Sequence, residues 1–247
     1  MIKRGIAILT YNRANYLREH IQAIIDTSPK DAKIVICDDG STDATVEIIR
    51  TFPVTYIRGP NRGVAANKNR ALYLLQDCHF VCLIEDDLFP QAKGWFEAYE
   101  KAAIHTNINH FCRVQEKEIP ETHGEFTVWM QKELGLTPVY GSSPRGDLTF
   151  ITAEVLREVG GLHPEFVGMG YAHGQWAERI DKAGLIGHPS KYIDIKEARD
   201  IFIQKGDTEG GRWNFPKSRT KEELKRNRNI LKKVNAASEV YIPICLP

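Results

Sequence analysis

The chain has 247 residues, of which 42% are hydrophobic and 26% are charged, so it is long enough for one well-buried core and has an ordinary globular composition. Its formal net charge of +1 provides no overall attraction for a polyanion, which argues against nucleic acid as a partner. No signal peptide is recognisable near Met1, and no apolar run approaches the roughly 20 residues that a membrane span needs. We therefore expect a single soluble, cytoplasmic domain over residues 1–247.

The cysteines argue against a disulfide framework. They are odd in number, scattered and mostly inside apolar segments, which is typical of buried, reduced thiols. A zinc site at the first close pair would need a second Cys or His pair that the sequence does not supply. We therefore expect no metal role for these thiols: Cys37, Cys78, Cys82, Cys112 and Cys245.

The first half of the chain alternates β-rich runs with helical patterns. This alternation predicts an α/β fold with a mainly parallel central sheet covered by helices. The expected strands are 5–10, 33–37, 54–57 and 80–84, and the expected helices cover 17–25, 41–50 (with Ser41 or Thr42 as its cap) and 64–75. Each unusual polar cluster follows a strand, at the edge where open parallel sheets bind ligands.

The second half is less regular. We expect helices over 94–105, 150–159 and 170–183, a strand over 111–114, and edge strands over 192–195 and 201–204. The stretch between 115 and Arg145 is rich in His, Pro, Gly and Glu and receives no element. Thr220 and Glu223 have the spacing of a capping box that would open a basic terminal helix.

Three adjacent carboxylates follow the strand expected at 80–84. Glu85, Asp86 and Asp87 would repel one another unless a cation or solvent relieved them. On an extended chain Glu85 and Asp87 point the same way and can share one ligand, while Asp86 faces elsewhere. Such hard oxygen ligands suit Mg²⁺ or Mn²⁺ held together with substrate phosphates. A solvated acidic turn is the alternative.

Four segments in this order resemble the family-2 and related glycosyltransferases of the GT-A fold. They are Ile8 with the five residues after it, Cys37 through Asp43, Asn61-Arg62-Gly63 leading to Asn67-Lys68-Asn69, and Leu83 through Asp87. A later match at Val159-Gly160-Gly161-Leu162 extends the resemblance to about Ala183. It implies a single GT-A domain with a nucleotide-sugar-binding half (1–90), an acceptor-side half (91–215) and a basic helix and tail (216–247).

The resemblance also implies roles in binding the donor and its metal. Asp38 or Asp39 would accept a hydrogen bond from the base, and Lys68 stands where the family commonly has Arg. Asp87 would bind Mn²⁺ or Mg²⁺, and Glu85 would contact the metal or the ribose, although the usual motif is Asp-x-Asp. The expected donor-site residues are Thr10, Tyr11, Arg13, Asp38, Asp39, Asn61, Lys68, Glu85 and Asp86, and the expected metal ligands are Asp87 and Glu85.

On the acceptor side, the resemblance implies a catalytic base where a glycine-rich turn runs into a helix. Relatives have an acidic pair there, but this sequence has Ala172-His173, and Gln175 replaces a further acid. A neutral imidazole with a pKa near 6.5 is a competent base, so we expect His173 to deprotonate an acceptor hydroxyl, with Asp147 as the second candidate. The resemblance implies displacement with inversion, onto a glycan or lipid-linked acceptor.

Further features could complete the site. Residues 206–213 have the composition of a mobile lid, and His188 or Asp207 could supply a third metal ligand. Aromatic side chains could stack on sugars, although most are expected in the core or at a rim: Trp129, Tyr140, Trp176 and Trp213.

The terminal helix carries a cluster of positive charge. Its basic residues are Lys217, Arg219, Lys221, Lys225, Arg226, Arg228, Lys232 and Lys233. We expect a solvated helix packed by a narrow apolar stripe, and peripheral contact with an anionic membrane is the alternative.

Other functions fit the sequence less well. A sugar nucleotidyltransferase would have a glycine-rich, arginine-containing signature after the first strand, where Thr10-Tyr11-Asn12-Arg13 stands instead. A nicotinamide-dependent enzyme would have Gly-x-Gly-x-x-Gly there. A nucleotide- or glycan-binding module that has lost catalysis stays open because Ala172, His173 and Gln175 replace the expected acids.

Overall fold

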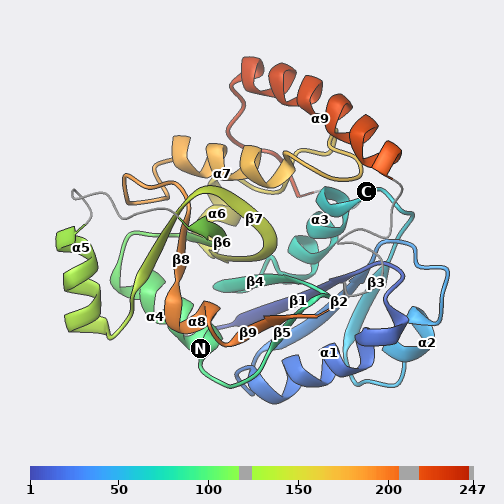
Figure 1. The fold of residues 1–247 in the computed structure, drawn as a ribbon, viewed down its shortest axis with the longest axis horizontal. Helices are drawn as coiled ribbons and strands as arrows, with labels where there is room; N and C mark the ends of the chain where they lie inside the picture. Colours follow the sequence, from blue (N-terminus) through green and yellow to red (C-terminus); the bar gives the residue numbers. More distant parts are fainter. Residues whose placement is uncertain (117–123, 206–216, 245–247) are drawn as a thin grey trace.

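A computed structural model describes residues 1–116, 124–205 and 217–244 (Figure 1). Its strands are β1 (Arg4–Thr10), β2 (Lys33–Asp38), β3 (Thr55–Arg58), β4 (Phe80–Glu85), β5 (Leu88–Pro90), β6 (His110–Glu116), β7 (Pro138–Thr152), β8 (Ile193–Ile195) and β9 (Phe202–Gln204). Its helices are α1 (Ala14–Thr27), α2 (Thr45–Ile49), α3 (Val64–Leu75), α4 (Trp95–His105), α5 (Gly124–Trp129), the π-helical turn η2 (Met130–Leu134), α6 (Ala153–Glu158), α7 (Ala172–Lys182), α8 (Lys196–Arg199) and α9 (Lys217–Ala237).

The central sheet is mixed, with a parallel half and an antiparallel half. Its strand order is β3-β2-β1-β4-β7-β6, and β8 pairs with β7 beside this path. Strands β1 to β4 run parallel, whereas β7 is antiparallel to β4, β6 and β8. Because β1, β2 and β4 are parallel neighbours, their carboxyl ends and the polar residues that follow lie at one edge of the sheet.

Two hydrophobic cores cover the two faces of the sheet. One contains Leu17, Ile21 and Ile24, whose four- and three-residue spacing places them on one side of α1, together with aromatic residues of α4. The other core packs residues of α3, α6 and α7 against the opposite face, and Val234 of α9 joins it. In Figure 1, α9 lies beyond α7 and α3, on the side of the sheet away from α1.

The first half agrees closely with the sequence prediction. The four parallel strands and α3 lie within one residue of their expected bounds at either end, and α1 contains the predicted apolar pattern. The predicted cap of α2 is wrong, because this helix begins at Thr45. The Asp43 carboxylate accepts the Thr45 N–H at 3.1 Å, and Ser41 is instead bonded to Asp38.

The second half contains the larger corrections. Residues 150–152, expected to begin a helix, end the 15-residue strand β7, and only Ala153–Glu158 is helical. The stretch without an expected element contains α5, η2 and the beginning of β7. Helix α9 begins at Lys217, so the predicted capping box lies inside it. No helix in the described ranges combines the length and apolarity needed to cross a membrane.

The thiols agree with the expectation of free cysteines. Cys37, Cys78, Cys82 and Cys112 are buried and unbridged, and Cys245 lies outside the described residues.

Candidate active site

A cavity of about 720 Å³ opens at the carboxyl ends of β1, β2 and β4. The residues after these strands form one wall, the bend of β7 around Gly146 forms a second, and the loop before α7 forms a third. Glu223 and Leu224 bring α9 to the rim. The cavity therefore lies between the parallel half of the sheet and the segments that follow it in sequence.

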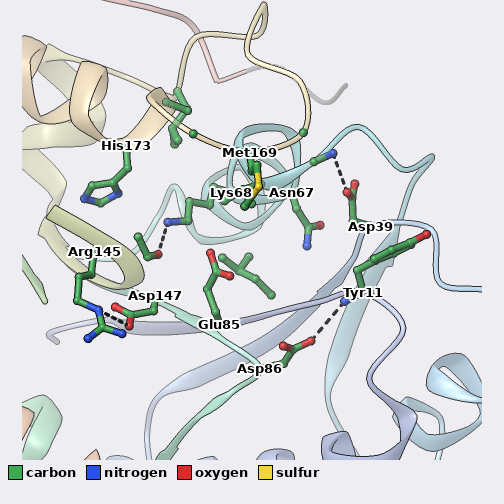
Figure 2. A pocket seen from close by; sticks show the side chains of 18 of the residues that line it. Tyr11, Asp39, Asn67, Lys68, Glu85, Asp86, Arg145, Asp147, Met169 and His173 are labelled. Atoms are coloured by element: carbon green, nitrogen blue, oxygen red, sulfur yellow. Dashed lines mark hydrogen bonds and ion pairs between the residues drawn. The ribbon is translucent and has the colours of Figure 1, made fainter. Parts of the chain in front are cut away.

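The end of β1 contacts the acidic triplet directly. Tyr11 N–H donates to Asp86 Oδ2 at 3.3 Å (Figure 2). Arg13 Nε lies 3.4 Å from Asp86 Oδ1. Burial raises the pKa of Asp86 to about 7, against the opposing effect of Arg13. Thr10, Tyr11 and Arg13 line the cavity together with Asp86, so these four predicted donor-site residues share one region.

The two aspartates at the end of β2, Asp38 and Asp39, differ in whether they line the cavity. Asp38 accepts the backbone N–H and hydroxyl of Ser41 at 2.9 and 2.5 Å, and it pairs with Arg58 at 3.1 Å. It is absent from the cavity lining among the described residues, which corrects its predicted place in the donor site. Asp39 does line the cavity.

Asp39 holds the next turn in place. Its carboxylate accepts the N–H groups of Arg62 and Gly63 at 3.1 and 2.7 Å and pairs with the buried Arg70 guanidinium at 2.8 Å. Burial raises the pKa of Asp39, and these donors oppose that effect. Because the same turn carries Asn61 into the cavity lining, Asp39 shapes this wall as well as facing the cavity.

Lys68 lies at the centre of a charged group. Its ammonium donates to the Gly146 carbonyl at 2.6 Å, and Figure 2 shows Lys68, Glu85 and Asp147 facing the same part of the cavity. Burial lowers the pKa of Lys68, while the nearby Glu85 and Asp147 carboxylates act in the opposite direction. Lys68 thus links the predicted donor-side acids to the strand that carries Asp147.

The acidic triplet has the chemistry of a divalent-cation site. All three carboxylates line the cavity, because β4 ends at Glu85 and strict alternation does not extend to Asp86. Burial raises the pKa of Glu85 to about 8, with Lys68 opposing and the adjacent aspartates reinforcing the effect. Asp87 Oδ2 accepts from Gln204 at 3.1 Å, whereas its buried Oδ1 has no hydrogen-bond partner among the described residues. A cation would satisfy that oxygen and relieve the mutual repulsion.

The opposite wall carries both candidate bases. Asp147 Oδ2 pairs with Arg113 at 2.9 Å and Arg145 at 3.2 Å, and in the part of the chain that is described its buried Oδ1 has no partner. His173 lies in the first turn of α7, with Nδ1 3.3 Å from the Thr149 hydroxyl. Burial, followed by Lys68 and His110, lowers the pKa of His173 well below its ordinary value. His173 is therefore a weaker proton acceptor than an ordinary imidazole.

Several other candidates lie away from the cavity or outside the described residues. His188 stacks with Tyr140 and Phe126, and Trp176 is a core residue whose indole donates to the Gly160 carbonyl. These residues and Trp129 are absent from the described cavity lining. The predicted lid, Asp207 and Trp213 fall outside the described residues.

Sequence analysis missed several residues of the site. Arg113 and Arg145 hold Asp147, Gln204 contacts Asp87, and α9 supplies part of the rim. The antiparallel strands and α9 bring these residues in from distant sequence positions. The hydrogen bond from Lys68 to Gly146 likewise joins residues 78 positions apart in the sequence, so no local sequence pattern predicts it.

Comparison with known proteins agrees with this architecture. The model of the family described as "Glycosyl transferase family 2" matches residues 5–132. Glycosyltransferase GlyA of Streptococcus pneumoniae serotype 4 is 33% identical over 94 residues, which is 36% of this chain and 14% of that protein. The chain thus matches only about a seventh of this curated relative's length.

Two solved structures share the fold at low sequence identity. Glucosyl-3-phosphoglycerate synthase from Mycobacterium tuberculosis, solved with Mn²⁺, UDP and glucosyl-3-phosphoglycerate, has a TM-score of 0.58 at 13% identity, covering 93% of this chain and 77% of that one. GalNAc-T7, solved with UDP, GalNAc and Mn²⁺, has a TM-score of 0.61 at 12% identity, covering 79% and 42%. The fold is that of GT-A structures, and because the family model spans more than half of the 247 residues, this chain belongs to glycosyltransferase family 2.

Proposed function

We propose that this protein transfers a sugar from a nucleoside diphosphate sugar to an acceptor hydroxyl with inversion, using Mn²⁺ or Mg²⁺. The observation that carries the proposal is a single cavity in which Asp87 Oδ1 is buried and unpartnered among the described residues while an aspartate lies on the opposite wall. Residues 1–90 would bind the donor and 91–215 the acceptor, with Glu223 and Leu224 of α9 at the rim.

UDP is the proposed nucleotide. Support comes from two of the solved proteins that share this fold, which contain UDP and Mn²⁺. Thr10, Tyr11, Arg13 and Asn61 would contact the base and ribose, and Asp39 would accept a hydrogen bond from the base. Asp87 and Glu85 would hold the metal, with Asp86 beside the ribose. When bound, the ion supplies positive charge that stabilises the departing diphosphate.

We assign the base to Asp147 in preference to His173. The lowered pKa of His173 makes it a poor proton acceptor, whereas Asp147 is oriented by two arginines through Oδ2 and keeps a free Oδ1 in the part of the chain described. Oδ1 would take the proton of the acceptor hydroxyl as its oxygen bonds to the anomeric carbon. The bond from that carbon to the diphosphate breaks, and the nucleoside diphosphate leaves with the electron pair.

The donor site is tested by thermal shift with UDP-, GDP- and dTDP-sugars, each with and without Mn²⁺. Ligand at about 100 times its Kd stabilises the native state by about 2.7 kcal/mol, which raises Tm by roughly 5–10 °C for a chain of this size. We expect the wild type to respond to one nucleotide with Mn²⁺ and Asp87→Ala not to respond. Asp77→Ala removes an exposed carboxylate paired with Lys3 and should behave as wild type. A panel without any shift in the wild type would contradict the proposal.

The base is tested by Asp147→Asn. We expect kcat to fall by about 100- to 10,000-fold, because amide oxygen cannot accept the proton effectively, while the nucleotide thermal shift persists. Asp181→Asn, on the outer side of α7 beside Lys191, is the matched control. Turnover of Asp147→Asn within twofold of the control would exclude this assignment, and a product that retains the donor's anomeric configuration would exclude inversion.

A binding module without catalysis is the second candidate. It is favoured by Ala172 and by the weak basicity of His173 at the positions where relatives have an acidic pair. Nucleotide binding with no release of nucleoside diphosphate, across many donors and acceptors, would support it over the enzyme.

A further inference from the structure

Behind the cavity wall, three potential metal ligands converge. His110 and Cys112 are two residues apart on β6 and therefore project from the same face of the sheet. His173, from the first turn of α7, meets them there, and one ligand atom of each residue lies within 4.8 Å of the other two. His110 and Cys112 are fully buried. His173 also lines the cavity, where Figure 2 shows its ring near the bend of β7.

The imidazoles of this cluster lack the partners that buried polar groups require. Neither ring nitrogen of His110 has a hydrogen-bond partner in the described structure, nor does Nε2 of His173. A buried polar group without a partner destabilises the fold, and native structures rarely leave such groups unsatisfied. His110 and His173 both have ring nitrogens without a hydrogen-bond partner, and both lie close to the Cys112 thiol. This combination points to a missing ligand that the three residues would share.

The surroundings of the cluster suit metal ligation. With Nδ1 protonated, His173 donates to Thr149 Oγ1 at 3.3 Å, which leaves the lone pair of its buried, unpartnered Nε2 for a metal. Thr149 pairs with Cys112 across β6 and β7, so the backbone fixes both. Burial raises the pKa of the Cys112 thiol well above its ordinary value, and the Ile193 backbone acts in the opposite direction, so the thiolate would form together with metal binding. Ligating histidines commonly donate their other N–H to such an oxygen partner.

The local charge is compatible with a cation. Burial, followed by the nearby Lys68, lowers the pKa of His110 to about 3 and the pKa of His173 well below its ordinary value. Metals bind the neutral form of imidazole. Lys68 itself would repel a metal ion, but the Cys112 thiolate would offset that repulsion. Glu85 and Asp147 also lie within electrostatic range of Lys68.

We propose that His110, Cys112 and His173 form a Zn²⁺ site distinct from the acidic site at Asp87. Two imidazoles and a thiolate suit a borderline-soft ion such as Zn²⁺, whereas the carboxylates of the acidic triplet suit Mn²⁺ or Mg²⁺. Tetrahedral zinc needs its ligand atoms about 3.3–3.6 Å apart, so the cluster would contract by about 1 Å on binding. Among the described residues no fourth His, Cys, Asp or Glu joins the group. The fourth position would hold water, as in zinc sites with three protein ligands.

Metal content gives a test that does not depend on sugar transfer. The full chain is equilibrated with Zn²⁺, freed of loosely bound ion and analysed for zinc by mass spectrometry. We expect about one zinc per wild-type chain and at least a tenfold loss of bound zinc in Cys112→Ser and His173→Gln. Cys82→Ser is the matched control, since Cys82 is equally buried but belongs to the core on the other face of the sheet. Asp87→Ala should also keep its zinc.

Two further measurements keep the test decisive if a buried variant fails to fold. Co²⁺ added to the wild type should give a thiolate-to-metal charge-transfer band and the visible bands of tetrahedral cobalt. Thr149→Val retains all three ligands and the shape of the side chain, and we expect it to weaken zinc binding by about 10–100-fold through loss of the His173 partner. The proposal would be overturned if folded wild-type protein bound no zinc and gave no cobalt–thiolate band. It would also be overturned if folded Cys112→Ser bound as much zinc as the wild type.

Discussion

At the scale of single residues, the buried pair of Arg70 and Asp39 organises the wall of the cavity between the end of β2 and the start of α3. Arg70 is 1% exposed, and its guanidinium also donates to Asn67 Oδ1 and to the Pro60 carbonyl. Through these contacts the guanidinium fixes Asp39, helix α3 and the turn that carries Asn61 relative to one another. Removing the arginine would leave a buried carboxylate without its charge partner.

We expect Arg70→Met to lower the free energy of unfolding by about 3–5 kcal/mol, the usual cost of breaking a buried ion pair from one side. Urea unfolding followed by circular dichroism measures this change. Arg157→Met is the matched control, because it breaks an exposed pair with Glu154 and should cost about 1 kcal/mol or less. Equal losses in the two variants would show that the Arg70 pair contributes no more than a surface contact.

The residue scale also shows which part of the site the sequence could predict. Asp39, Glu85 and Asp87 lie at or within two residues of the ends of β2 and β4, so a local pattern was enough to bring them to one edge of the sheet. Asp38 follows the same rule but turns away, because Ser41 and Arg58 bind its carboxylate. The cluster of His110, Cys112 and His173 forms through the pairing of β6 with β7 and the position of α7. No sequence motif predicts either of these, so the cluster could not be predicted from the sequence.

At the scale of elements, one backbone contact joins the two sides of the cavity. Gly63, at the start of α3, forms a parallel bridge with Gly168, through Val64 N–H to the Gly168 carbonyl and Gly168 N–H to the Arg62 carbonyl, both 3.1 Å. Gly63 has φ +92°, and a Cβ there would lie 2.3 Å from the Gly168 nitrogen. Only glycine allows this conformation and this approach together.

We expect Gly63→Ala to destabilise the fold by about 2 kcal/mol or more, from backbone strain together with a clash. Gly174→Ala is the opposite case, because its Cβ would meet nothing within 4 Å inside α7. That variant should gain about 0.5–1 kcal/mol from helix propensity. Thermal unfolding of both variants measures the contrast, and a neutral Gly63→Ala would show that the two loops can separate without cost.

The elements also show where prediction from sequence stops. Short apolar runs followed by turns identified the parallel strands, because β1, β2 and β4 are buried over most of their length. The edge strand β3 is mostly exposed. The long strand β7 was not predicted because its partners differ along its length. It pairs with β8 from Pro138 to Tyr140, with β6 between Gly141 and Ile151, and with β4 from Leu148 to Thr152. Its polar bend at Gly146 and its apolar end therefore have different environments, and no single periodicity describes both.

At the scale of the whole molecule, buried neutral histidines couple stability to pH. Burial lowers the pKa of His20 to about 4, although its ring nitrogen bonds to the Leu88 carbonyl at 2.9 Å. The unfolded chain protonates this residue below about pH 6.5, whereas the folded chain resists protonation until about pH 4. The free energy of unfolding therefore falls as pH decreases through this window.

We expect His20→Gln to lose about 3 kcal/mol less stability than the wild type between pH 7 and pH 4, the equivalent of 2.5 pKa units. Urea midpoints across this range provide the measurement. The raised carboxyl pKa values of Glu85, Asp86 and Asp194 act in the opposite sense, but they are present in both proteins and cancel in the difference. The exposed His105→Gln should show the wild-type slope, and the same slope in His20→Gln would refute this account.

Helix α9 and the residues after it have a consequence for synthesis on the ribosome. Asn227 is 1% exposed and donates to the Met169 carbonyl at 2.8 Å, and Gly161 N–H donates to the Ile242 carbonyl at 2.9 Å. The loop before α7 thus depends on contacts made about 60–80 positions later in the chain. Nascent domains tend to fold from the N-terminus, so the parallel strands can pair while this side of the cavity is still open. The nascent chain should complete the cavity, and with it acquire sugar transfer, only after residue 242 has left the exit tunnel.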